Sequence, residues 1–230
     1  MQIKYLDPGR VSYEEGLAIQ NSIHKSLTNS KKNELTNDGL DQTLILCEHT
    51  PVYTLGKSGK LDNLLYSEEE LVSEGIEYFN TNRGGDITYH GPGQIVGYPI
   101  IDMDFFYHDV HRYVRDIEEV IIRSLTGLGI ESFRVEGLTG VWVNGKLEGH
   151  KNKICAIGIH MSRWVTLHGF ALNVNTDLQY FKGIIPCGIS ESNKSVTSIS
   201  EELGRIIDIS EVKEIIIKKF EEVFNVEILK

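Results

Sequence analysis

One cysteine of this sequence stands in a context that favours chemistry. Cys187 lies between Pro186 and Gly188, where a rigid turn can project the sulfur and leave neighbouring amides accessible. Most cysteines are inert buried residues, and an unperturbed thiol with a pKa near 8.5 is only about 3% ionised at neutral pH. A nucleophilic Cys187 therefore requires a nearby base or cation, and the turn alone leaves a structural role open.

Lys153 is a candidate for that partner, because it directly heads the apolar run at residues 154–159. Partial desolvation at such a position favours the neutral amine, which can act as a base. The alternative is a lysine at a strand end whose ammonium group stays in solvent. Strict alternation puts Lys153 on the face of Cys155 and puts Ala156 and Gly158 on the opposite face. Both faces can line one pocket only if the strand ends, twists or bulges there.

Residues 83–94 form a glycine-rich run, in which four glycines and one proline flank the β-prone stretch Ile87-Thr88-Tyr89. Glycine lets backbone amides approach a ligand without an intervening Cβ. Arg83, before the paired glycines, suits an anionic or carbonyl-rich ligand. A tight hairpin with structural turns is the alternative for the glycines alone. The run matches neither a phosphate-binding P-loop nor a dinucleotide fingerprint, so nucleotide binding is not supported.

His168 and Gly169 open a further stretch of small residues that suits the wall of a pocket. A lone histidine, however, is more often a hydrogen-bonded residue of the core. The sequence leaves both interpretations of His168 open.

In their order along the chain, the run at residues 83–94, the Lys153 strand, residues 164–175 and Pro186-Cys187-Gly188 resemble the lipoyl(octanoyl) transferases of the lipoate- and biotin-ligase-like superfamily. The resemblance covers about residues 44–199, and it implies that Cys187 is the nucleophile and Lys153 its partner. Asp86 stands where the family more often has glutamine, which affects fine specificity rather than class. The substrate-binding residues implied by the resemblance are Arg83, Gly84, Gly85, Asp86, Ile87, Thr88, Tyr89, His90, Ala156, Ile157, Gly158, Gly169, Phe170 and Ala171.

The resemblance also implies a two-step reaction. Cys187 would attack the octanoyl or lipoyl thioester of an acyl carrier protein, with Lys153 as base. A lysine of an apo-lipoyl domain, in a 2-oxoacid dehydrogenase complex or the glycine cleavage H protein, would then take the acyl group as an amide. The thioester is already activated, so no ATP, cofactor or metal is implied. Burial of seven tail carbons is worth about 5 kcal/mol, enough to select chain length.

Other functions remain open from the sequence. An ATP-dependent lipoate or biotin ligase would share the fold but needs no cysteine nucleophile. An amidotransferase would move octanoyl or lipoyl groups between protein domains, also through a cysteine. A non-catalytic module that binds lipoyl domains would keep the pocket without needing both Lys153 and Cys187.

Composition predicts a cytoplasmic globular protein. The 230 residues are 40% hydrophobic and 24% charged, and no stretch approaches the roughly 18 apolar residues that span a bilayer. The polar N-terminus does not fit a signal peptide. Three widely spaced cysteines argue against a disulfide framework and a zinc site. A net charge of −10 disfavours binding to nucleic acid or anionic membranes, so acidic protein partners need a local basic patch.

The elements that must position these residues follow from periodicity and turn signals. Ser67 is expected to cap a short helix, and Asn144-Gly145 predicts a two-residue hairpin. We expect a single catalytic domain over residues 1–230, of the α/β (α+β) class, with a mixed β-sheet flanked by helices as in lipoate and biotin protein ligases. The expected strands are 3–6, 43–48, 95–101, 141–143, 153–161 and 166–174, and the expected long helices are 12–31, 110–128 and 210–224.

Overall fold

A mixed sheet passes through the whole molecule. The computed structural model describes residues 1–32, 41–185 and 193–230, and within them the sheet has ten strands. The strand order is β13 (Glu227–Leu229), β1 (Gln2–Leu6), β3 (Thr43–His49), β7 (Gln94–Ile100), β11 (Val165–Asn173), β10 (Lys151–Ser162), β9 (Leu138–Asn144) and β8 (Phe133–Val135); β12 (Lys194–Val196) pairs with β10 and β2 (Arg10–Val11) with β3. The β1–β13, β1–β3, β2–β3 and β10–β12 pairs are parallel, and the others are antiparallel.

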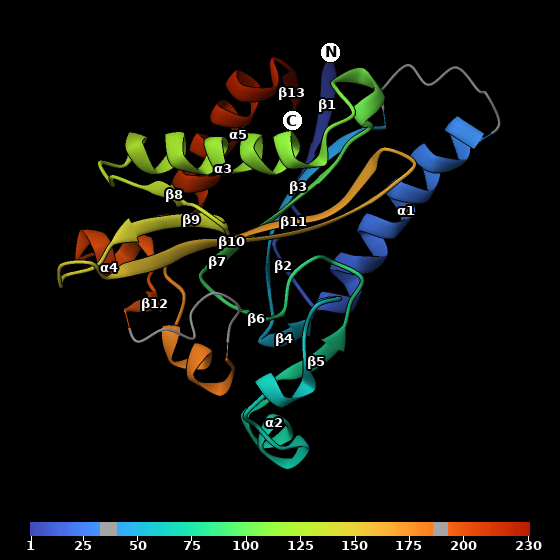
Figure 1. Cartoon of the computed structure of the whole chain (residues 1–230). Coiled ribbons are helices and arrows are strands. Elements are labelled where there is room, and N and C mark those ends of the chain that lie inside the picture. Colours follow the sequence, from blue (N-terminus) through green and yellow to red (C-terminus); the bar gives the residue numbers. More distant parts are fainter. Residues whose placement is uncertain (33–40, 186–192) are drawn as a thin grey trace.

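Helices cover both faces of this sheet (Figure 1). On one face lie α3 (Val110–Gly127) and α5 (Ile209–Phe224), whose apolar stripes join the largest core cluster. On the other face lies α1 (Tyr13–Lys32), where Ile19, Ile23 and Leu27 recur every four residues and pack against the sheet. Apolar residues of β7 and β11 pack into the cores on both faces of the sheet, because successive side chains of a strand point to opposite faces.

A second, three-stranded sheet forms a lobe on the side away from α3 and α5 (Figure 1). Its strands are β5 (Glu77–Asn80), β4 (Val52–Leu55) and β6 (Ile87–His90), in that order. A core of tyrosines and aliphatic residues holds it to α2 (Glu68–Glu74) and to the 3₁₀ helix η3 (Leu178–Gly183). The remaining short helices are η1 (Leu61–Asn63), η2 (Met103–Phe105) and α4 (Ile199–Leu203).

The elements expected from the sequence are confirmed at their positions, including the cap of α2. There Ser67 Oγ accepts from the Glu70 amide at 3.2 Å, and the Glu70 carboxylate accepts from the Ser67 amide at 2.7 Å. No described helix is long and apolar enough to cross a membrane. The expected cytoplasmic location stays a prediction.

The predicted two-residue turn between β9 and β10 is wrong. Asn144 pairs with Lys151, so residues 145–150 form a six-residue connection, and Gly145 N donates to His150 O at 2.8 Å. The two-residue turn expected for Asn-Gly requires positive φ at both residues, and neither Asn144 nor Gly145 has it; Gly149 takes the left-handed conformation instead. The longer loop changes which residues of β9 lie opposite Lys153.

Candidate active site

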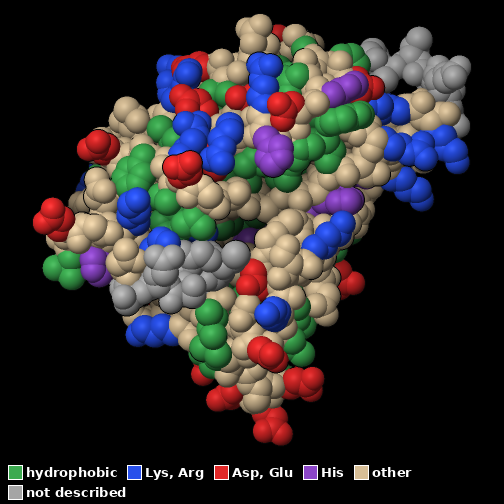
Figure 2. Space-filling view, viewed as in Figure 1, with side chains coloured by type: hydrophobic (Ala, Val, Ile, Leu, Met, Phe, Trp, Pro, Cys, Tyr) green, Lys and Arg blue, Asp and Glu red, His purple; other side chains and the backbone are tan. Residues whose placement is uncertain are grey.

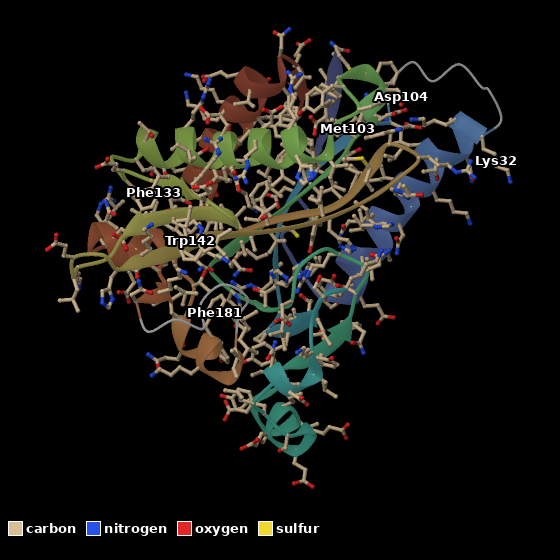
Figure 3. All side chains as sticks on the ribbon, viewed as in Figure 1. Lys32, Met103, Asp104, Phe133, Trp142 and Phe181 are labelled. Atoms are coloured by element: carbon tan, nitrogen blue, oxygen red, sulfur yellow. The ribbon has the colours of Figure 1, made fainter. Side chains whose placement is uncertain are left out.

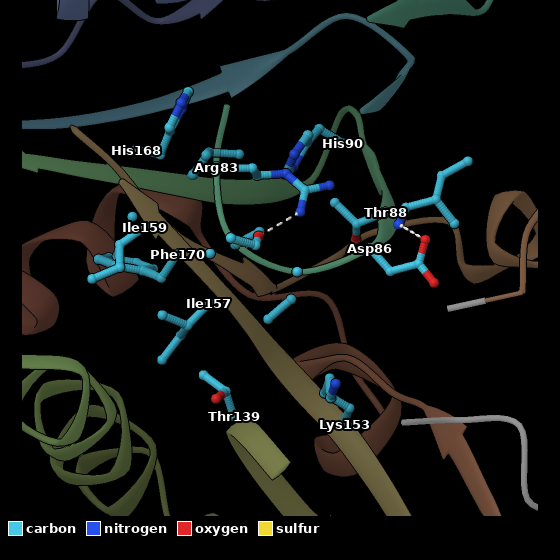
Figure 4. A pocket seen from close by; sticks show the side chains of 18 of the residues that line it. Arg83, Asp86, Thr88, His90, Thr139, Lys153, Ile157, Ile159, His168 and Phe170 are labelled. Atoms are coloured by element: carbon cyan, nitrogen blue, oxygen red, sulfur yellow. Dashed lines mark hydrogen bonds between the residues drawn. The ribbon is translucent and has the colours of Figure 1, made fainter. Parts of the chain in front are cut away.

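A cavity of about 360 Å³ lies where the main sheet meets the small-sheet lobe. Its volume falls within the range of about 300–1,000 Å³ that small-molecule sites occupy. Lys153 and all the substrate-binding residues expected from the sequence except Tyr89 line it. Figure 4 shows residues of the Arg83 loop on one side of the β10 ribbon and Ile157 and Thr139 on the other. Three separate segments of the chain therefore meet at one site.

A β-bulge in β10 decides which residues share the cavity face. Lys153 pairs with Trp142 and Cys155 with Val141, so Ile154 is an extra residue on β10. Ile154 and Cys155 both point into the core under α3. The extra residue reverses the alternation, so the expectation that Lys153 shares a face with Cys155 is wrong. Lys153 instead lies on the cavity face.

Small residues form the floor of this face. Ala156 pairs with Ala171 and Gly158 with Gly169 across β10 and β11. The glycines do not leave open space, however. A Cβ on Gly158 would lie 2.6 Å from the Gly84 carbonyl oxygen, and one on Gly169 would meet the backbone of β7. The glycines allow backbones to pack closely, while the alanines present their methyl groups to the cavity.

Ile157 and Phe170 lie on the opposite face of the sheet and pair with each other across β10 and β11. Both contact the core under α3, yet both line the cavity, together with Val114 and Thr139. The cavity therefore extends around β10 beyond the point where β9 diverges from it. This extension supplies apolar walls on both sides of the strand.

Arg83 is buried in the wall opposite β10, and its exposed fraction is 8%. Its guanidinium donates to the Thr54 hydroxyl and carbonyl and to the Gly84 carbonyl, at 2.5–3.2 Å. Burial lowers the pKa of Arg83 from its usual value. These bonds fix the guanidinium in the wall and bend the Arg83–Gly84 segment towards β10, where Gly84 N donates to Ile159 O at 2.8 Å.

A chain of hydrogen bonds runs from Arg83 beneath the cavity. His90 lies 3.3 Å from the Thr54 hydroxyl through Nε2 and 2.8 Å from Gln94 Oε1 through Nδ1. The Gln94 amide donates to Asn173 Oδ1 at 2.9 Å, and the Asn173 amide donates to Thr197 O. Because Gln94 Oε1 can only accept, the network assigns the proton to Nδ1 of a neutral His90. Thr197 N in turn donates to Lys153 O, so the chain ends at the Lys153 backbone.

Both cavity histidines are held neutral. Burial lowers the pKa of His90 to about 3, with further contributions from His49 and Arg83. Burial also lowers the pKa of His168 to about 3, and Arg83 adds to the effect. His168 has a left-handed φ of 61° and bonds Asn82 at 2.6 Å. It both lines the cavity and is a hydrogen-bonded buried residue, so the two interpretations of His168 are compatible.

Tyr89 is the expected residue that does not reach the cavity. It is fully buried in the lobe, pairs with Tyr53 and stacks on Tyr180 with ring centroids 4.7 Å apart. Its neighbours in β6, Thr88 and His90, point the other way and line the cavity, as strand alternation requires. Tyr89 thus packs into the core of the lobe, on the side of β6 away from the cavity.

The chain on both sides of Cys187 adjoins this site, although residues 186–192, Cys187 among them, lie outside the described residues. On one side, Ile185 N donates to Asn63 O at 2.8 Å, and Asn63 Nδ2 donates to the Asp86 carboxylate at 2.5 Å. On the other side, Asn193 O accepts from Lys151 N, and β12 pairs with β10 through Lys153. The flanks of the segment are therefore fastened to opposite walls of the cavity.

The two described cysteines are not candidates for the nucleophile. Cys47 and Cys155 are both fully buried. Burial raises the pKa of Cys47 to about 12 and raises that of Cys155 further. Both therefore stay protonated thiols in the core.

Several cavity residues could not be found from sequence patterns. Tyr13 comes from α1 and Tyr98 from β7, each in an ordinary apolar pattern, and Asn173 ends β11 as a single polar residue. Gln94 closed the glycine-rich run, but nothing in the run distinguished it. Only the fold brings these residues to the cavity.

Comparison with known proteins identifies the family. The model of the lipoyl protein ligase A/B catalytic domain matches residues 12–221. The chain belongs to this family. It is 47% identical over 228 residues to an octanoyltransferase of Cytophaga hutchinsonii, covering 96% of this chain and 92% of the relative. It is 48% identical over 232 residues to an octanoyltransferase of Flavobacterium johnsoniae, covering 99% of each.

Solved structures confirm the expected fold. A lipoate-protein ligase A bound with ATP superposes with a TM-score of 0.73 at 19% identity, covering 100% of this chain and 88% of that one. A biotin protein ligase from Aquifex aeolicus, in complex with biotin and ATP, gives 0.53 at 13% identity, covering 96% and 70%. At these identities the likeness concerns the fold. It establishes the lipoate and biotin protein ligase architecture for this family member.

The buried neutral histidines predict a loss of stability in acid. Below about pH 6.5 the unfolded chain binds protons at His90 and His168 that the folded protein excludes, so the free energy of unfolding falls as pH falls. Each histidine is expected to remove about 2 kcal/mol between pH 7 and pH 5. Urea unfolding of His168→Asn at the two pH values should therefore show a smaller loss than the parent protein.

The control for this measurement is His111→Asn, since His111 is exposed on α3. Its loss of stability between pH 7 and pH 5 should equal that of the parent. An equal loss in His168→Asn and the parent would contradict the neutral, buried state of His168.

Proposed function

We infer that this chain is an octanoyltransferase, in which residues 1–230 act as one catalytic domain that moves an octanoyl group onto lipoyl-domain lysines. The observation that carries this inference is its identity of nearly one half, over almost the entire chain, to proteins named octanoyltransferase. The cavity agrees with that activity, because its alanine floor and aliphatic walls suit a medium-length alkyl tail. ATP-bound ligase structures share only the fold, at 19% identity or below.

We propose Cys187 as the nucleophile. It is the remaining cysteine of the three, since Cys47 and Cys155 are buried in the core. Two residues before Cys187, Ile185 N donates to Asn63 O, and Asn63 Nδ2 donates to the carboxylate of Asp86, which lines the cavity. The attachment of Ile185 and Asn193 beside the cavity and the family resemblance together support this assignment.

Lys153 is proposed as the base, on the grounds that it lines the cavity on the same face as the small residues. The Cys187 proton passes to the Lys153 amine, and the thiolate attacks the octanoyl thioester carbonyl. Collapse of the tetrahedral intermediate breaks the bond to the donor's sulfur, which takes the proton from the Lys153 ammonium. The target lysine amine then attacks the Cys187 thioester, the bond to the Cys187 sulfur breaks as the amide forms, and a proton of the amine passes to that sulfur and restores the thiol. His90 and His168 are poorer bases because their pKa values lie near 3.

The proposed donor is octanoyl acyl carrier protein, and the proposed acceptors are apo-lipoyl domains of 2-oxoacid dehydrogenase complexes or the glycine cleavage H protein. On the face of this protein that Figure 2 shows, acidic and basic side chains are intermixed, and acidic side chains gather at the tip of the small-sheet lobe. Glu68, Glu69 and Glu70 are exposed at the start of α2. An acidic partner should therefore dock away from α2, and the local basic patch expected from the sequence stays a prediction.

Trapping the acyl-enzyme tests this function. The protein incubated with octanoyl carrier protein, without ATP, should gain the mass of one octanoyl group. Cys187→Ser should gain none, because a serine hydroxyl is far less ionised than a thiol. Cys47→Ala and Cys155→Ala are the controls and should still form the adduct. An adduct on Cys187→Ser, or one that forms only with ATP and free octanoate, would refute the mechanism.

The alanine floor predicts a change in chain-length preference. Ala156→Leu adds three carbons to the cavity face and should exclude a similar number of tail carbons, at about 0.8 kcal/mol each. We expect kcat/KM for the octanoyl donor to fall by about fiftyfold, with a much smaller loss for a pentanoyl or butanoyl donor. Ala18→Leu, on the exposed side of α1, is the matched control and should change neither value. An unchanged length profile in folded Ala156→Leu would place the tail elsewhere.

A further inference from the structure

Trp142 lies directly beneath the proposed base. The Lys153 ammonium is 4.7 Å from the centroid of the Trp142 ring, and the two residues are register partners in β9 and β10. The ring is fully buried. It lies outside the lining of the cavity, so it can act on a substrate only through Lys153.

The choice of tryptophan at this position carries a cost. Its indole Nε1 is buried and has no hydrogen-bond partner in the described part of the chain. A buried unpaired donor destabilises a protein by roughly 1–3 kcal/mol, and phenylalanine would fill much of the space without it. Tryptophan, however, is the aromatic residue that attracts a cation most strongly. The cost is therefore explained if the ring face is needed for the ammonium.

The strand that carries Trp142, β9, is held in place by α3 on the other face of the sheet. The buried Glu118 carboxylate of α3 accepts from Gly140 N at 3.0 Å and pairs with Arg115 and Arg134. Gly140 has a φ of 119°, and a Cβ there would lie 2.6 Å from the Cys155 carbonyl oxygen. This close approach lies next to the bulge that turns Lys153 to the cavity face.

A neighbouring pair provides an internal comparison. Phe133 of β8 is the register partner of Trp142, and the Lys151 ammonium lies 6.0 Å from its ring centroid. Figure 3 shows Phe133 and Trp142 on adjacent strands at this end of the sheet. Each ring thus has a lysine ammonium near its face. The Lys153–Trp142 contact is the closer of the two, and of these two lysines Lys153 is the one that lines the cavity.

We propose that Trp142 is a positioning residue, whose ring holds the Lys153 ammonium where it can serve the acyl-transfer reaction. The proposal rests on the function inferred above. The ring face stabilises the ammonium that forms when Lys153 takes the thiol proton and limits the directions in which its flexible stem can point. Phe133 has no such role, since Lys151 is farther from its ring.

The contact itself is tested without any activity measurement. The chain has two tryptophans, Trp142 and Trp164, so Trp164→Phe leaves Trp142 as the single indole fluorophore. In that background, Lys153→Met should change the emission maximum or lifetime, because a charge is removed from the ring face. Lys146→Met, in the β9–β10 loop, is the control and should overlay the parent. An unchanged spectrum for Lys153→Met would overturn the proposal.

The role in the reaction is tested by steady-state transfer of the octanoyl group from octanoyl carrier protein to an apo-lipoyl domain. Trp142→Leu should lower kcat about tenfold, as expected for the loss of a cation–π contact, with KM within about twofold. Trp142→Phe keeps a ring that attracts a cation less strongly and should recover part of that loss, and Phe133→Leu should leave kcat unchanged. Equal kcat values for the Leu and Phe variants of Trp142, or a loss confined to KM, would reduce Trp142 to a core residue.

The two tests separate this proposal from the proposed function. If the unaltered protein forms no acyl-enzyme, the octanoyltransferase mechanism fails, and the emission measurement still decides whether Lys153 lies on the Trp142 ring. If Trp142→Leu does not fold, the emission result and the kcat of Trp142→Phe decide the matter. In that case a kcat for Trp142→Phe as low as that of Lys153→Met contradicts the proposal.

Discussion

The β-bulge between Lys153 and Cys155 is the constraint on which the rest of the site depends. Without the extra residue Ile154, Lys153 would point into the core under α3, where an amine without a partner is costly. With it, the lysine shares a face with Ala156 and Gly158, and one strand supplies both the proposed base and the floor of the acyl cavity. Bulges commonly re-aim a side chain beside an active site. Here the reversed alternation of β10 places Lys153 and the small residues of the cavity floor on the same face of one strand.

The opposite wall of the cavity is held by buried polar bonds. Arg83, Thr54, His90, Gln94 and Asn173 form one hydrogen-bonded chain that leads to the backbone of Lys153. Each buried polar group in it has a partner, which is the condition for such a network to stabilise a unique geometry. Because both cavity histidines are neutral, this wall presents no titrating charge near neutral pH, which agrees with the proposed proton transfer between Lys153 and the thiol.

Much of this site could be predicted from the sequence. The family resemblance implied that the glycine-rich run and the small residues of two strands line one pocket, and the fold brings residues 83–88, 156–158 and 169–171 to the same cavity. These segments can meet because glycine and alanine let their backbones pack closely. The family resemblance predicted the fold class, which the solved structures confirm. Tyr89 shows the limit of a contiguous motif, since alternation turns its ring away from the cavity.

The bulge and the Trp142 contact could not be predicted, for a physical reason. An unbroken apolar run gives no sign of an extra residue, because Ile154 and Cys155 suit a regular strand equally well. The partner of Lys153 depends on the register of β9 and β10, which the connecting loop sets. The expected two-residue turn at Asn144-Gly145 would place Glu136 opposite Lys153. The actual loop, residues 145–150, places Trp142 there.

The central claim is that Lys153, rather than another lysine of this region, activates the thiol. The most direct measurement is the rate at which Cys187 reacts with a small alkylating agent as a function of pH, in Lys153→Ala, Lys146→Ala and Lys151→Ala. Loss of the ammonium that stabilises the thiolate should move the Lys153→Ala profile to higher pH, while the other two overlay the parent protein. A Lys153→Ala profile that coincides with the parent would contradict the account and leave the activation of Cys187 to another group.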